Sequence, residues 1–216
     1  MPLNYDATGL KAGAKHYRAW VGPPANFDKL SAMQFCVLWL LGLRDHHYLL
    51  DIGCGSLRGG RLFIPYLLPG RYFGIEPEQW LVGKGIKHEL GEDIVRIKQP
   101  RFDYNADFDL GVFGQTFDYL VAQSIFSHAA PAQITTCLAS AHDVMHKDSI
   151  FIATYRPGEV DGVADYEGTE WVYPGCTWYR TETMVRMADE AGFSCVPYAP
   201  PKGIWSPAWL LYKLRG

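Results

Sequence analysis

Apolar positions along the chain follow two different spacings, and the two alternate. Apolar side chains recur every three or four positions, as one buried helix face requires, in 26–43, 58–68, 79–90, 134–145 and 181–191. Compact apolar runs of strand type occupy 48–52, 72–75, 117–122, 149–154, 193–196 and 208–214. Strands that alternate with helices predict parallel strands joined by right-handed crossovers, and therefore an α/β fold.

One long stretch has neither spacing. Residues 156–180 are rich in Gly, Tyr, Trp and Pro and show no clear period. Such a stretch after a predicted strand is typical of a long loop at the strand ends, and loops of this kind carry binding residues. We therefore expect 156–180 to be an insertion loop near the substrate.

Length and charge limit the possible classes of protein. The chain has 216 residues, of which 48% are apolar, so it can bury one substantial core. We expect a single domain over 1–216, with an N-terminal helical segment (1–44) and a core (45–214). The net charge is -3 and charged residues form no long run, so the chain lacks the basic patch that a nucleic-acid partner would need.

The cysteines and the apolar runs bear on location. The five cysteines are scattered and form no CxxC pair, which favours free thiols and no metal site. The most apolar run, 35–43, is far shorter than the roughly 20 residues of a membrane-spanning helix, and no leader pattern opens the sequence. We expect a soluble cytoplasmic protein with no membrane partner, and we leave its oligomeric state open.

The first strand runs into a glycine-rich turn, Asp51-Ile-Gly-Cys-Gly-Ser56. Glycines at such a turn let backbone N–H groups approach a ligand closely. A dinucleotide fingerprint would need a small residue at position 58, where this chain has Arg58, and no phosphate-binding GxxxxGK motif is present. The carboxylate of Asp51 repels phosphates but suits a ligand with an ammonium or sulfonium group, and S-adenosylmethionine is such a ligand.

The residues Leu50-Asp-Ile-Gly-Cys-Gly-Ser56 resemble the first motif of class I S-adenosylmethionine-dependent methyltransferases. The resemblance implies a Rossmann-like, doubly wound, three-layer α/β/α fold with a seven-stranded sheet whose last strand is antiparallel. One departure is Leu57, which stands where the common motif has a third glycine, and Gly59 and Gly60 are candidates to compensate for it.

The resemblance also implies a set of cofactor-binding residues. Glu76, at the end of the second strand, would take the ribose hydroxyls, as the acid of dinucleotide folds does. In the family's order of strands, a third strand would end near Asn105, and 117–122 resembles the fourth strand. Polar residues after these two strands would face the adenine and the methyl group. The full set is Asp51, Gly53, Cys54, Gly55, Ser56, Glu76, Asn105, Asp107, Gln123 and Ser124.

Methyl transfer is an in-line displacement that needs positioning more than it needs a base. His128, shortly after the fourth strand, is the candidate general base, and the alternative is a structural histidine that holds a loop. Arg58 is either a ligand for an anionic group of the substrate or a surface residue.

Aromatic residues are candidates for a substrate pocket. Tyr155, Trp171 and Tyr173 are expected to wall it, with packing inside the loop as the alternative. Trp20 and Trp205 extend the same expectation to an aromatic-lined cleft. The stretch 15–22 precedes the sheet and resembles the segments that cover the cofactor in this superfamily, so we expect it to act as a lid.

The sequence thus predicts a methyltransferase that uses S-adenosylmethionine on oxygen or nitrogen of a small molecule. Two alternatives stay open. One is a non-catalytic protein that binds the cofactor as a sensor or scaffold, and the other is an NAD-dependent oxidoreductase. The sequence does not identify the methyl acceptor, because substrate specificity in such folds lies in the loops.

Overall fold

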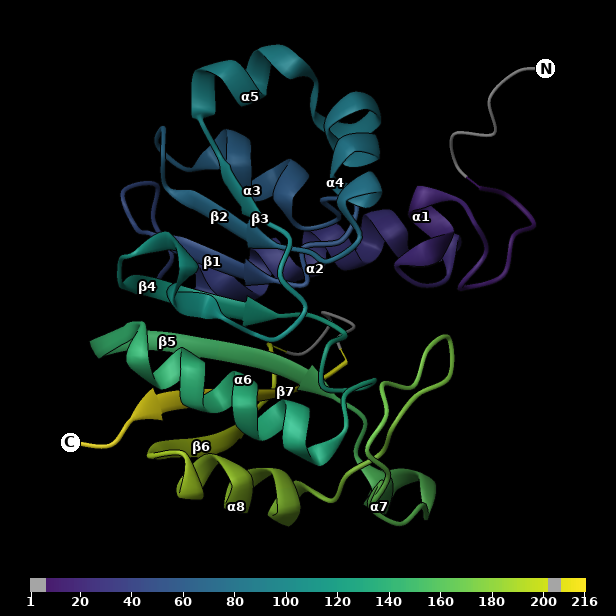
Figure 1. Cartoon of the computed structure of the whole chain (residues 1–216), viewed down its shortest axis with the longest axis vertical. Coiled ribbons are helices and arrows are strands. Elements are labelled where there is room, and N and C mark those ends of the chain that lie inside the picture. Colours follow the sequence, from purple (N-terminus) through teal and green to yellow (C-terminus); the bar gives the residue numbers. More distant parts are fainter. Residues whose placement is uncertain (1–6, 202–206) are drawn as a thin grey trace. The chain divides into compact units, whose positions relative to one another are not determined.

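The computed structural model describes residues 7–201 and 207–216, which leaves Trp205 outside the described residues, and Val160 and Asp161 are described by their backbone only. Its strands form a seven-stranded sheet in the order β3-β2-β1-β4-β5-β7-β6 (Figure 1). The strands are β1 (Leu49–Ile52), β2 (Tyr72–Ile75), β3 (Arg101–Asp103), β4 (Phe117–Ala122), β5 (Met145–Tyr155), β6 (Phe193–Tyr198) and β7 (Ala208–Leu214).

The strand directions confirm the expected fold class. The pairs β1–β4, β2–β3 and β4–β5 are parallel, and β7 runs antiparallel to both β5 and β6. Strand order reverses between β1 and β4, where Asp51 lies opposite Val121. In open α/β sheets, ligands bind at the carboxyl ends of the strands beside such a reversal.

Helices and helical turns connect the strands. They are α1 (Tyr17–Trp20), η1 (Pro24–Asn26), α2 (Phe27–Leu40), α3 (Gly60–Tyr66), α4 (Gln79–Gly85), the π-helical turn η2 (Ile86–Leu90), α5 (Glu92–Lys98), η3 (Leu110–Phe113), α6 (Pro131–Asp143), α7 (Gly158–Asp161) and α8 (Thr181–Glu190). Within the described part of the chain, no helix is long and apolar enough to cross a membrane.

The chain divides into two compact units. Unit 1 contains the described residues up to His47 together with Gly53–Tyr104, and unit 2 contains Tyr48–Ile52 and the described residues from Asn105 onward. The organisation of 1–216 as a single domain stays a prediction.

In unit 1, α2 packs on α3, and α3 also packs on α5 and β2. Phe27, Val37 and Leu38 of α2 are buried, as the helical spacing predicts, and so are Phe63 and Ile64 of α3. Each fully buried side chain of this size contributes about 1.5–3 kcal/mol.

In unit 2, α6 and α8 lie side by side and pack on β5 and β6, respectively (Figure 1). Unit 2 also contains a cluster of aromatic rings. The Phe151 ring stacks on the Tyr212 ring at 5.1 Å between centroids, and Phe126 and Phe193 meet the Tyr212 ring edge-on. Such pairs add to the stabilisation from burial.

Several predicted boundaries were wrong. The helix predicted from position 58 to 68 spans only Gly60–Tyr66, because the turn continues to Gly59 and Leu67 is extended. The predicted helix 134–145 ends at Asp143, since β5 begins at Met145. Hydrophobic spacing did not predict α5 or β3, because elements of seven and three residues are too short to show a period.

Candidate functional site

The glycine turn, residues 53–56, folds back onto the end of β2 within unit 1. The amides of Gly53 and Cys54 both donate to the carbonyl oxygen of Ile75, at 2.8 and 3.0 Å. Gly53 and Gly55 have φ values of 70° and 57°, which glycine adopts without steric cost. Cys54 is buried beside Gly74, where a β-carbon would lie 2.8 Å from its Sγ atom, so both strand and turn require their glycines.

Glu76 follows β2 and holds its carboxylate against this turn. Oε2 accepts the N–H of Gly55 at 2.9 Å, and Oε1 accepts the N–H of Glu78 at 2.9 Å. The residue is 9% exposed. A carboxylate only accepts hydrogen bonds. The result is a fixed acceptor-only group beside the glycine turn, which suits a ligand with hydroxyl groups.

Leu57 stands in the left-handed region, with φ 60°, at the position where the resembled motif has glycine. Two other glycines make room for its fully buried side chain. A β-carbon at Gly60 would lie 3.1 Å from Leu57 Cδ2, and one at Gly85 would lie 3.0 Å from Leu57 Cγ. A leucine here costs about 1–2 kcal/mol of backbone strain, which burial of its side chain offsets. Gly60, one of the two expected glycines, thus faces Leu57.

The stretch 15–22 lies against the glycine turn in the same unit. A β-carbon at Gly55 would come within 2.6 Å of Val21 Cγ1, so Val21 packs directly on this glycine. Arg58, 6% exposed, donates from Nη1 to the carbonyl oxygen of Val21 at 2.5 Å. The structure therefore places Arg58 on the backbone of this stretch, and a contact of Arg58 with substrate stays a prediction.

Ion pairs connect α1 to the helices around it. Glu89, whose side chain is only 4% exposed, accepts from Arg18 at 2.6 Å, from Arg61 at 2.9 Å and from the Tyr17 hydroxyl at 2.9 Å. Both arginines also contact Asp28. Burial and the hydrogen bond to Glu89 raise the pKa of Tyr17. The segment that carries Val21 is thus fixed by a largely buried carboxylate.

In unit 2, the predicted cofactor residues after β1 and β4 lie at neighbouring strand ends. Asp51 is 2% exposed and lies one residue before the end of β1, opposite Val121 of β4, which precedes Gln123 by two positions. Ser124 has φ 62°, and its N–H donates to Thr154 Oγ1 at 2.7 Å. Sequence analysis missed Thr154, because an isolated threonine inside a strand gives no signal.

His128 is held by the long loop of unit 2. Its Nδ1 atom lies 2.9 Å from the carbonyl oxygen of Val172 and 2.7 Å from that of Gly175. Carbonyl oxygens only accept hydrogen bonds, so Nδ1 carries the hydrogen, and Nε2 is the basic atom of the neutral ring. These contacts fit a structural histidine that holds the loop. A role for His128 as general base stays a prediction.

The aromatic residues expected to wall a pocket differ in their surroundings. The rings of Trp171 and Tyr173 lie 5.7 and 5.3 Å from the His128 ring, and Trp171 is 41% exposed. Tyr155 is 5% exposed, and its hydroxyl lies 2.6 Å from Thr181 Oγ1. Trp171 and Tyr173 thus gather at the candidate base, whereas Tyr155 is buried beside α8.

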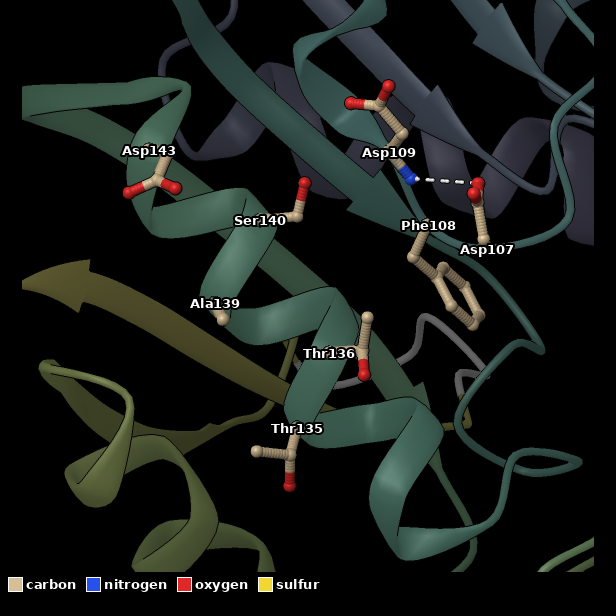
Figure 2. Close-up of a pocket in the computed structure, with 8 residues that line it drawn as sticks. All are labelled: Asp107, Phe108, Asp109, Thr135, Thr136, Ala139, Ser140 and Asp143. Atoms are coloured by element: carbon tan, nitrogen blue, oxygen red, sulfur yellow. Dashed lines mark hydrogen bonds between the residues drawn. The ribbon is translucent and has the colours of Figure 1, made fainter.

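The two candidates for the adenine contact lie in the loop after β3. Both polar ends of the Asn105 side chain bond to the backbone of Asp109, at 3.1 and 3.2 Å. Asp107 lines an open cavity of about 480 Å³ between this loop and α6 (Figure 2). Phe108, Thr136 and Ser140 are among its other lining residues. Asn105 thus shapes the loop, and Asp107 faces a cavity.

Comparisons with known proteins concern the fold. No protein-family model and no curated protein matches the chain. Among solved structures, magnesium protoporphyrin IX methyltransferase from Synechocystis PCC 6803, with bound SAM, has a TM-score of 0.65 at 12% sequence identity. The match covers 89% of this chain and 81% of that chain.

Two proteins from Streptomyces give similar values. The CcbJ methyltransferase from Streptomyces caelestis has a TM-score of 0.65 at 13% identity, with 90% of this chain and 98% of that chain covered. DesVI from Streptomyces venezuelae has a TM-score of 0.64 at 14% identity, with 87% and 93% covered. Together with the strand order and the antiparallel β7, these matches show that the chain has the Rossmann-like fold of class I methyltransferases.

Proposed function

We propose that this chain transfers the methyl group of S-adenosylmethionine to an oxygen or nitrogen atom of a small molecule. The observation that carries the proposal is the carboxylate of Glu76 on the N–H of Gly55. It joins the acid after β2 to the glycine turn after β1 in one compact unit. A fold shared with methyltransferases, one of them with bound SAM, supports the same function.

The residues of the turn and of Glu76 fit the proposed cofactor. Gly53 and Gly55 adopt the positive φ values that the turn needs, and Glu76 suits the two ribose hydroxyls. Asp51, buried near the end of β1 and two positions before Gly53 in the sequence, is an acidic residue that suits the cationic end of the cofactor.

When bound, the cofactor would supply a methyl group on a sulfonium, so that the acceptor's lone pair bonds to the methyl carbon and the carbon–sulfur electron pair stays on sulfur as a neutral thioether. We assign the proton that the acceptor loses to Nε2 of His128, because Nδ1 already carries a hydrogen toward Val172 and Gly175. Trp171 and Tyr173, whose rings lie close to this ring, are the proposed wall for the acceptor.

The oxidoreductase alternative is less well supported. Dinucleotide folds use a small residue at the position of Arg58, because the helix there packs closely on the strand. Here the Arg58 side chain is buried and bound to Val21. No observation favours the sensor alternative over the enzyme.

Thermal unfolding of the full chain with S-adenosylhomocysteine or NAD separates the two cofactors. We expect the unfolding midpoint to rise with S-adenosylhomocysteine and to stay constant with NAD, because only a ligand bound by the folded state stabilises it. A rise with NAD alone would favour the oxidoreductase.

A further inference from the structure

Three polar side chains meet at the carboxyl ends of β4 and β5. The Gln123 Nε2 atom lies 2.9 Å from Ser124 Oγ and 3.4 Å from Thr154 Oγ1. Thr154, 2% exposed, also accepts the N–H of Ser124. Two hydroxyl groups therefore fix one end of the Gln123 amide.

The other end of that amide is buried and unsatisfied. Gln123 is 6% exposed, and its Oε1 atom has no hydrogen-bond partner among the described residues. An unsatisfied buried carbonyl is costly in a folded protein, and each one calls for an explanation. A ligand that donates a hydrogen bond to Oε1 would remove the cost.

The position of Gln123 agrees with a ligand contact. It directly follows β4, which borders β1 at the reversal of strand order, where ligands bind in open α/β sheets. The side chain is held from β5 by Thr154, so it is preorganised by a rigid strand. An amide oxygen in this place takes an N–H or O–H group, and the nucleophile of a methyl acceptor carries such a group.

We propose that Oε1 of Gln123 accepts a hydrogen from the amine or hydroxyl group that becomes methylated, and that Thr154 is its positioning residue. This rests on the proposed function. It moves Gln123 from the cofactor to the acceptor. No bond forms or breaks at Gln123; the hydrogen bond orients the nucleophile so that its lone pair faces the methyl group.

The test compares two cofactor analogues on the full chain by calorimetry. Sinefungin carries an amine where S-adenosylmethionine carries its methyl group, so its N–H groups point into the space that the nucleophile would enter, and S-adenosylhomocysteine carries nothing there. In Gln123→Met we expect sinefungin affinity to fall about 10-fold or more, the size of one hydrogen bond to a charged group, with S-adenosylhomocysteine affinity unchanged within about threefold. In Thr154→Val, the ratio of sinefungin affinity to S-adenosylhomocysteine affinity should fall in part. Thr154→Ser keeps the hydroxyl group and should keep the ratio of the unaltered chain.

Gln115→Met is the matched control. Gln115 also has a buried amide end without a partner among the described residues, but it precedes β4 at the opposite end of the strand. In Gln115→Met, the ratio of sinefungin affinity to S-adenosylhomocysteine affinity should equal that of the unaltered chain. If Gln123→Met does not fold, Gln123→Glu replaces it and should bind sinefungin more tightly than the unaltered chain.

An unchanged ratio in Gln123→Met, or weaker sinefungin binding in Gln123→Glu, would overturn the inference. If neither analogue binds the unaltered chain, the proposed function fails instead.

Discussion

The carboxylate of Glu76 and the amide of Gly55 form a hydrogen bond of 2.9 Å that closes the glycine turn onto the end of β2. On its other side, Gly55 is covered by Val21. Gly55 is thus in contact with both the proposed ribose acid and the stretch 15–22, and the function of the turn depends on the absence of a side chain there.

Gly55→Ala should destabilise the fold and weaken cofactor binding. The new β-carbon would lie 2.6 Å from Val21 Cγ1, and the alanine would have to adopt a φ of 57°. Gly70→Ala is the control, since Gly70 has φ 72° and nothing within 4 Å. We expect the control to lose about 1–2 kcal/mol from backbone strain alone and Gly55→Ala to lose clearly more in urea unfolding. Equal losses would show that Val21 does not confine the turn.

Glu89→Gln should release the stretch 15–22. The substitution leaves Arg18 and Arg61 around a largely buried group that is no longer charged, while both keep Asp28, and we expect a loss of about 1.5–3 kcal/mol. Asp93→Asn, in the exposed pair with Arg96, should cost under about 1 kcal/mol. The measurement is urea unfolding, together with the dissociation rate of S-adenosylhomocysteine, which should rise only in Glu89→Gln. A rate that stays constant despite lost stability would contradict a lid role for this stretch.

His128→Ala and His128→Asn separate the two roles of the histidine. An asparagine amide can donate to the carbonyl oxygens of Val172 and Gly175, as Nδ1 does, whereas alanine cannot. We expect His128→Ala to lose about 1–3 kcal/mol of unfolding free energy and His128→Asn to lose less. Equal losses would mean that the hydrogen bonds from Nδ1 do not hold the loop.

Alkaline pH should destabilise unit 2 through Tyr179. Burial raises the pKa of Tyr179 to about 12, and its hydroxyl donates to the carbonyl oxygen of Ala129. Because an unfolded tyrosine ionises near pH 10, this contribution is complete below about pH 10 and is lost as pH rises toward 12. Tyr179→Phe should therefore show a shallower fall of unfolding free energy over that interval. Parallel curves for the two proteins would rule Tyr179 out as the cause.

Hydrophobic spacing predicted the sheet well where strands combine a clear apolar run with flanking turn residues. The strands 72–75, 117–122 and 208–214 were predicted with their observed boundaries, because each combines an apolar run with turn residues at both ends. In contrast, all three residues of β3 are partly or fully exposed, so no apolar run marks it. The helix predicted over 79–90 is continuous but changes to a π-helical turn at Ile86, which a period of 3.6 residues does not reveal.

Only part of the candidate site could be predicted from the sequence. The glycine turn and Glu76 could be predicted because their spacing is local and depends on strand ends. Val21, Glu89 and Thr154 could not, because each acts through a partner that is distant in sequence: Gly55, Arg18 with Arg61, and Gln123. Leu57, a departure from the glycine pattern, is explained only by the space that Gly60 and Gly85 leave for its side chain.

Calorimetric titration with S-adenosylhomocysteine tests the central claim most directly. The account predicts that the full chain binds one equivalent and that Asp51→Ala and Glu76→Ala each lose affinity about 10-fold or more. Glu78→Ala, which removes an exposed carboxylate that bonds to Trp80, should bind as the unaltered chain does. No binding by the full chain, or undiminished binding by Asp51→Ala and Glu76→Ala, would contradict the account.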